Sequence, residues 1–130
     1  MKRILLSINP EHVENILNGT KKYEFRKVKC KKAVNEIVIY STAPVMKVVA
    51  SVSVKKVIEG EPEKVWDITK DGAGIEKSHF DKYYEKSSCA VAYKLGKVKK
   101  FDVPVSLEEY GITRPPQSFM YLQSSKCSCQ

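Results

Sequence analysis

Apolar residues follow two spacings along the chain, one typical of strands and the other typical of helices. Unbroken or alternating apolar residues predict strands at residues 4–8, 22–26, 36–41, 47–58, 89–95 and 119–122, with a short extended stretch at 101–105. The segment 47–58 alternates over more residues than an average strand contains, so we expect a bend or a bulge within it. Strand signals are therefore spread along the whole sequence.

The first helical signal follows the first predicted strand. Asn9 is suited to be the N-cap, and Pro10 fits the first helical position, where its missing N–H costs nothing. Val13 and Ile16 then fall on one face of the helix. Gly19 ends it, because glycine readily takes the left-handed conformation that closes a helix.

Two further helices are expected in the middle of the chain. One begins at Pro62, and the other spans residues 76–86. Phe80, Tyr83 and Tyr84 have helical spacing in the latter, and we expect these three rings to pack in the core.

This order of elements predicts an α+β fold, with a mixed, curled sheet of five or six strands and two or three flanking helices. Helices alternate with strands too rarely for a doubly wound nucleotide-binding fold, and no Gly-rich phosphate loop is present. With 130 residues, 42% of them hydrophobic, the chain can bury a core without disulfides. We expect one domain over residues 1–122 and a flexible tail over residues 123–130.

No apolar run approaches the ~20 residues of a membrane-spanning helix, and the first residues do not form a signal peptide. We therefore expect a soluble, cytoplasmic protein. The four cysteines lack C-x-x-C spacing and are interpreted as free thiols, so neither a metal nor a cofactor is predicted. The alternative is a metal site that joins Cys127 and Cys129 to Cys30 and His79.

The chain carries a formal charge of +8, from 23 basic and 15 acidic residues, and most of this excess lies before residue 36. Basic residues crowd around Glu24, and they are Lys21, Lys22, Arg26, Lys27, Lys29, Lys31 and Lys32. Such a run attracts polyanions, each neutralised phosphate adding to a salt-sensitive affinity. The alternative is a solvated surface that serves solubility alone.

The segment from residue 19 to residue 26, Gly-Thr-Lys-Lys-Tyr-Glu-Phe-Arg, is the most informative in the chain. A loop presents Lys21, and the following strand places Glu24 and Arg26 on one face, opposite a buried aromatic face. Lysine and arginine together can bind phosphate, while a carboxylate can accept hydrogen bonds or act as a base. The alternative is a surface ion pair between Glu24 and Arg26 beside a solvated Lys21.

This segment matches the pattern G-x-K-x-x-E-x-R, and with it the chain resembles the ASCH family, whose members are related to PUA RNA-binding domains. The similarity extends to Asn9 and Pro10, residues 39–44, the region of Trp66, residues 80–84 and residues 115–119. The resemblance implies a small PUA-like mixed β-barrel with a cleft lined by the residues of the pattern.

It also implies that the protein is an RNA-binding or other nucleic-acid-binding module, with a role in regulating transcription or translation. Lys21 and Arg26 would then contact phosphate or a base edge, and Glu24 would select a hydrogen-bond donor. Further attraction would come from Lys22, Lys27, Lys29, Lys31 and Lys32. The expected partner is RNA or a nucleotide, while DNA and the oligomeric state stay open.

The resemblance leaves a second possibility, an enzyme that acts on RNA or modified nucleosides in the same cleft. For a metal-dependent ribonuclease, family position makes Lys21, Tyr40 and Ser118 the catalytic candidates, with Glu24 as a base or a metal ligand. An N4-acetylcytidine amidohydrolase of the family uses a nucleophilic threonine where this chain has Glu24, which argues against that activity. Neither His12 nor His79 is well placed by the sequence.

Overall fold

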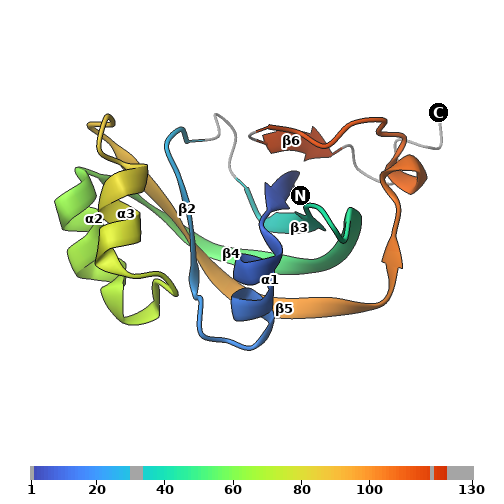
Figure 1. The fold of residues 1–130 in the computed structure, drawn as a ribbon, viewed down its shortest axis with the longest axis horizontal. Helices are drawn as coiled ribbons and strands as arrows, with labels where there is room; N and C mark the ends of the chain where they lie inside the picture. The colour runs from blue at the N-terminus through green and yellow to red at the C-terminus, as the bar shows by residue number, and fades with distance from the viewer. Residues whose placement is uncertain (1, 30–33, 118, 123–130) are drawn as a thin grey trace.

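The predicted helices and strands form one mixed sheet with helices beside it in the computed structural model, which describes residues 2–29, 34–117 and 119–122 (Figure 1). The strands are β1 (Arg3–Ile8), β2 (Tyr23–Arg26), β3 (Glu36–Ser41), β4 (Lys47–Gly60), β5 (Ala90–Val105) and β6 (Phe119–Leu122). The helices are α1 (Pro10–Leu17), α2 (Pro62–Thr69) and α3 (Lys77–Tyr83), with the 3₁₀ turns η1 (Lys70–Gly72) and η2 (Leu107–Tyr110). The expected α+β fold class is confirmed.

The sheet has the order β2-β5-β4-β3-β1-β6 and curls into a half-barrel (Figure 1). β1 pairs with β3 in parallel, and the other neighbours pair antiparallel. Register shifts interrupt the β4–β5 ladder, as the length of the predicted strand 47–58 led us to expect. β2 and β6 are the edge strands of this order, and the curl brings β2 towards β1 although three strands separate them.

One strand prediction is wrong. The segments 89–95 and 101–105 are parts of a single strand, β5, which continues through Gly96. The reason is its partner: β4 offers hydrogen-bonding groups along its whole length, from Gly60 opposite Ala90 to Val48 opposite Val105. Gly96 itself lies at the register shift between Leu95 and Val98, and a glycine in a strand commonly marks such an irregularity without ending the strand.

The predicted boundaries of the first helix are confirmed. Asn9 precedes α1, and Pro10 is its first residue. Gly19 has φ +88°, the left-handed conformation expected after a helix end. Val13 and Ile16 are buried against the sheet, which anchors α1 beside β3 and β5.

The third helix is shorter than predicted, because α3 ends at Tyr83 rather than at residue 86. Phe80 and Tyr84 are buried as expected, at 1% and 3% exposure. Tyr83 is 37% exposed, so its assignment to the core is wrong. It stands next to the bulky Tyr84, which takes the inward position, and its own ring is left beside solvent.

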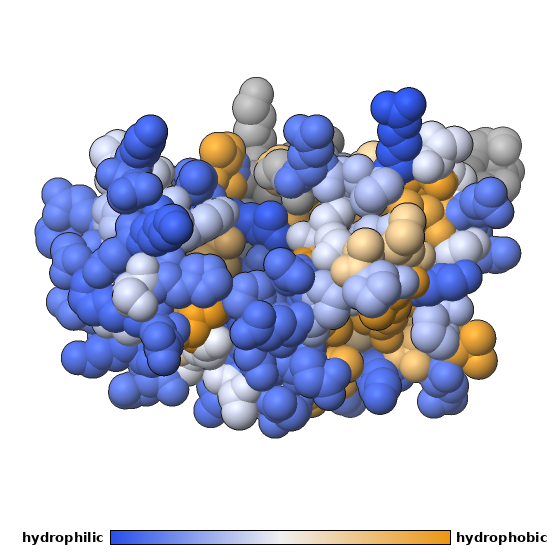
Figure 2. Space-filling view, in the orientation of Figure 1, coloured by the Kyte–Doolittle hydropathy of each residue, from blue (hydrophilic) through white to orange (hydrophobic). Residues whose placement is uncertain are grey.

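Three clusters of buried side chains hold the elements together. The first lies between α1 and the sheet, and the third lies around Leu5 and Leu107. The second packs α2 and α3 against β2 and β5, with the Phe80 ring 4.9 Å from Trp66 and 5.2 Å from Phe25. Hydrophilic residues cover most of the face drawn in Figure 2. Within the described ranges, no helix has the length and apolar character needed to span a membrane.

Candidate functional site

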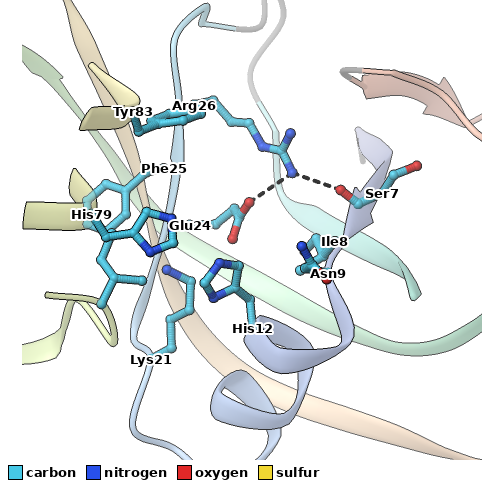
Figure 3. A pocket seen from close by; sticks show the side chains of 11 residues that line it. Ser7, Ile8, Asn9, His12, Lys21, Glu24, Phe25, Arg26, His79 and Tyr83 are labelled. Atoms are coloured by element: carbon cyan, nitrogen blue, oxygen red, sulfur yellow. Dashed lines mark hydrogen bonds and ion pairs between the residues drawn. The ribbon is translucent and has the colours of Figure 1, made fainter. Parts of the chain in front are cut away.

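α1, β1, β2 and α3 surround a pocket of about 190 Å³ (Figure 3). We call it the signature pocket, and it is lined by Ser7, Ile8, Asn9, His12, Lys21, Glu24, Phe25, Arg26, Ile75, His79 and Tyr83. The three charged residues of the G-x-K-x-x-E-x-R pattern thus lie in one place. Glu24 and Arg26 share a face of β2, as the alternation of the strand predicts, and Lys21 reaches the pocket from the preceding loop.

Lys21 is the most deeply buried of these charges, with 4% of its surface exposed. Its ammonium donates a hydrogen bond to the Ala73 carbonyl at 3.1 Å and lies 4.8 Å from the centre of the Phe25 ring. Its stem packs on Gly74, where a Cβ atom would stand 2.5 Å from the Lys21 Cβ. The alternative of a solvated lysine is therefore wrong.

Burial lowers the pKa of Lys21 from its usual value, because a charged ammonium loses hydration inside the protein. Glu24 acts in the opposite direction, and Arg26 adds to the lowering. The buried ammonium of Lys21 therefore retains hydrogen-bond donors that the described residues do not use. Lysine has three N–H donors, and the described residues provide one acceptor within hydrogen-bonding distance.

Glu24 and Arg26 form the ion pair that the sequence suggested, but inside the pocket wall. Arg26 Nη2 lies 2.8 Å from Glu24 Oε2, and the two side chains are 16% and 9% exposed. The same Nη2 donates to the Ser7 carbonyl of β1 at 3.2 Å (Figure 3). β2 was expected to bury one face only, yet Glu24 is 7% exposed, because β1 and α1 stand over its polar face.

Two histidines that the sequence analysis set aside lie in the signature pocket. His12 projects from α1 and His79 from α3, with ring centroids 5.7 Å apart (Figure 3). Burial lowers the pKa of His12, Lys21 and His79 lower it further, and Glu24 opposes them. No sequence signal could have joined them, since 66 residues of the chain, among them strands β2 to β4 and helix α2, separate the two histidines.

Two buried polar atoms of the pocket have no hydrogen-bond partner in the described structure, His12 Nδ1 and Arg26 Nε. Unpartnered buried polar groups cost free energy, and native proteins tend to keep them where a ligand or water completes the bond. Together with the ammonium of Lys21, they give the pocket hydrogen-bonding groups that the described residues do not use.

The other candidate residues differ in where they lie relative to the signature pocket. Lys27 places its ammonium 4.7 Å from the centre of the Tyr83 ring at the pocket rim. Lys22 is exposed on the loop before β2, and Lys29 lies 3.7 Å from Glu59. Cys30, Lys31, Lys32, Ser118, Cys127 and Cys129 lie outside the described residues.

Tyr40 is not brought to the signature pocket. It is 3% exposed and packs in the third cluster beside Val38 and Val48. The residue opposite it in the parallel ladder, Ser7, does line the pocket, and its hydroxyl donates to the Pro116 carbonyl at 2.7 Å.

The signature pocket has few side chains that could coordinate a metal ion. Glu24 is engaged by Arg26, and the ammonium of Lys21 stands beside it. In the part of the chain that the structure describes, no three His, Cys, Asp or Glu residues converge as a metal site requires. The described residues do not fit a metal centre.

The fold has counterparts among solved structures. A crystal structure of ASCH from Zymomonas mobilis superimposes with a TM-score of 0.87, over 98% of this chain and 92% of that one, at 25% identity. The chain folds as an ASCH domain. A variant of the same Zymomonas protein gives a TM-score of 0.88 at 24% identity, over 99% of this chain and 96% of the variant. The small PUA-like fold expected from the resemblance is confirmed.

Sequence comparison also identifies relatives of the chain. An "ASCH domain-containing ribonuclease" of Zymomonas mobilis is 26% identical and covers 96% of this chain and 87% of its own length. The large ribosomal subunit protein uL22 of Ureaplasma parvum is 29% identical over 92% of this chain, and the ASCH domain described here spans about two fifths (39%) of its length. No protein-family model matches the chain.

Proposed function

We propose that this ASCH domain binds RNA and that the signature pocket receives one nucleotide of it. The observation that carries the proposal is the buried ammonium of Lys21, 4% exposed, in a pocket that also contains the Glu24–Arg26 pair. Burying a cation is costly unless a partner compensates it. Glu24 is already bonded to Arg26, so an anionic or acceptor-rich ligand would supply the missing partner.

The shape of the pocket supports a single nucleotide rather than a duplex. Its volume, about 190 Å³, lies below the roughly 300 Å³ at which pockets for drug-sized ligands begin. Sequence-reading proteins commonly take unpaired bases into such pockets and recognise them by hydrogen bonds to their edges. Here Phe25 and Ile75 provide apolar wall, and Lys21, Glu24 and His12 provide donors and acceptors.

The charges also support a polyanion. The formal charge of +8 already counts every acidic residue, so this excess of basic groups has no counterpart within the chain, and Lys27 stands at the pocket rim. The relative from Zymomonas mobilis that covers nearly the whole chain is named a ribonuclease, a protein that acts on RNA. A regulator of transcription or translation could use such a domain to recognise its RNA.

The test is binding of a fluorescent eight-nucleotide single-stranded RNA, followed by anisotropy at several salt concentrations. Lys21→Met keeps the stem that packs on Gly74 but removes the charge, and we expect it to weaken binding at least ~10-fold. Lys64→Met removes a charge from an exposed position of α2 and is the matched control. Equal affinity of the folded Lys21→Met variant and the unchanged protein would contradict the proposal.

A second candidate function is cleavage of the bound RNA, and the pair of histidines favours it. A neutral His12 can take the proton of a 2′-hydroxyl, whose oxygen then attacks the adjacent phosphorus, while His79 donates a proton to the departing 5′-oxygen as the P–O5′ bond breaks. Lys21 would stabilise the charge on the phosphorane. The products would be a 2′,3′-cyclic phosphate and a free 5′-hydroxyl.

Incubation of end-labelled RNA with the protein, with and without a metal chelator, separates binding from cleavage. Product that persists with chelator and disappears in His12→Gln supports cleavage by the histidine pair. Binding without product supports an RNA-binding module that does not cleave its RNA. The amidohydrolase alternative lacks the threonine of that enzyme, because Glu24 stands at its position and the hydroxyl of the exposed Thr20 is bonded to Asn18 Oδ1 at 2.8 Å.

A further inference from the structure

A second, larger groove lies next to the signature pocket, and Lys21 lines both. We call it the lysine groove, because Lys22, Lys55 and Lys94 stand on its walls. Its volume is about 580 Å³, and its floor is formed by apolar side chains that include Leu95. The loop before β2, the β4–β5 ladder and the end of α2 enclose it.

The charge of the lysine groove is nearly all positive. Asp71 is the acidic residue among those that line it. In the described ranges of the chain, the structure shows no ion pair for Lys22, Lys55 or Lys94. Three uncompensated ammonium groups on one concave surface attract an anion of matching length.

Two glycines allow these lysines to lie close to the main chain. A Cβ atom at Gly72 would stand 3.0 Å from the Lys22 Cβ, and one at Gly96 would stand 3.2 Å from the Lys55 Cγ. The Lys22 N–H also donates to the Gly72 carbonyl at 2.7 Å. The bases of these two stems therefore lie close to the main chain, while both lysines stay exposed to solvent.

The pairing of β4 with β5 brings like charges together. Lys94 lies directly opposite Lys56, and the register shift beside Lys56 places Lys55 near the same point of the ladder. Like charges at opposing positions destabilise a sheet. Lysines that lie together at this point lower the stability of the free protein, and a bound polyanion would offset that loss.

We propose that the lysine groove binds the phosphates of the RNA strand that adjoin the nucleotide in the signature pocket. Lys21 lines both, so the two cavities adjoin at this residue and one strand can reach from one to the other. The proposal rests on RNA binding by the signature pocket and adds the path of the strand. It assigns most of the electrostatic attraction for RNA to the lysines of the β4–β5 ladder rather than to the lysines that follow Arg26.

The experiment compares two double variants on the same protein. Lys55→Gln with Lys94→Gln removes two charges from the lysine groove, while Lys99→Gln with Lys100→Gln removes two exposed charges from β5 outside it. Each is titrated with the eight-nucleotide RNA and with a single nucleoside monophosphate, at salt concentrations from 50 to 200 mM chosen to resolve the salt slope.

We expect the groove variant to bind the RNA ~10-fold more weakly and to flatten the slope of log affinity against log salt by about 1.4, or about 0.7 for each lost phosphate contact to a single strand. Its affinity for the monophosphate should stay within twofold of the unchanged protein, and the control variant should change the RNA affinity less than the groove variant does.

The outcomes separate the two proposals. If the unchanged protein binds RNA and the two double variants lose affinity equally, the lysine groove is refuted while RNA binding by the signature pocket stands. If the unchanged protein binds neither ligand, the proposed function itself fails. If the groove variant loses affinity for both ligands alike, the groove does not hold a separate part of the strand, and the inference is also overturned.

Discussion

Arg26 and Ser7 belong to strands that three others separate in the sheet, yet Arg26 Nη2 donates a hydrogen bond to the Ser7 carbonyl at 3.2 Å. The same nitrogen pairs with Glu24 at 2.8 Å. One side chain therefore spans the opening of the half-barrel, ties its two sides together and forms a wall of the signature pocket. The stability of the sheet and the shape of the site depend on the same contact.

This relationship predicts that Arg26→Lys is not a conservative change. The lysine side chain is one bond shorter, so its ammonium does not reach the position from which Nη2 contacts both acceptors, and we expect a loss of about 1–2 kcal/mol in the free energy of unfolding. Arg26→Ala leaves the carboxylate of Glu24 buried without its partner and should cost about 3 kcal/mol. Urea denaturation measures both. Restoration of stability in the double variant with Glu24→Gln would confirm that the unpaired charge causes the larger loss.

Two glycines with left-handed backbone provide a matched pair. Gly74 has φ +71°, and a Cβ atom there would stand 2.5 Å from the Lys21 Cβ, whereas Gly19 has φ +88° and open space around it. Gly19→Ala carries only the backbone penalty, about 1 kcal/mol, and Gly74→Ala should cost about 2–3 kcal/mol because Lys21 must also move. Thermal melts give the stabilities. Equal losses of stability at both positions would show that the Lys21 side chain moves aside without a cost in free energy.

Acid should weaken the fold through His12. Burial lowers the pKa of His12 in the folded protein, so the unfolded chain takes up a proton more readily. The contribution of neutral His12 to stability is complete above the unfolded pKa of about 6.5 and is lost as the pH falls through the lower, folded pKa. His12→Gln should therefore reduce the drop in melting temperature between pH 7.5 and pH 5.5. An identical drop in both proteins would assign the acid sensitivity to other groups.

Tyr84 and Tyr83 are neighbours with different roles. The Tyr84 hydroxyl donates to the Arg26 carbonyl at 2.7 Å, inside the second core cluster. Tyr84→Phe leaves that carbonyl without its donor, and we expect a loss of about 1 kcal/mol in the free energy of unfolding. In the described residues the Tyr83 hydroxyl has no hydrogen bond, so Tyr83→Phe should be nearly neutral. Chemical denaturation of the two variants provides the comparison.

Local signals in the sequence determined much of the fold. Asn9, Pro10 and Gly19 set the ends of the first helix because capping depends on residues within one turn. Alternation placed Glu24 and Arg26 on one face of their strand, since side chains of a strand point to opposite sides in turn. These features need only near neighbours in the chain, and the structure reproduces them.

What covers each face was decided only in the tertiary structure. The sequence could not show that Lys21 and Glu24 are buried, because their cover comes from α1, β1 and the residues around Ala73. It could not unite His12 with His79, which meet only when the sheet curls and brings α1 towards α3. Periodicity determines the direction in which a side chain points, whereas long-range strand order determines what it meets. The chemistry of this pocket therefore depends on the long-range order of the strands.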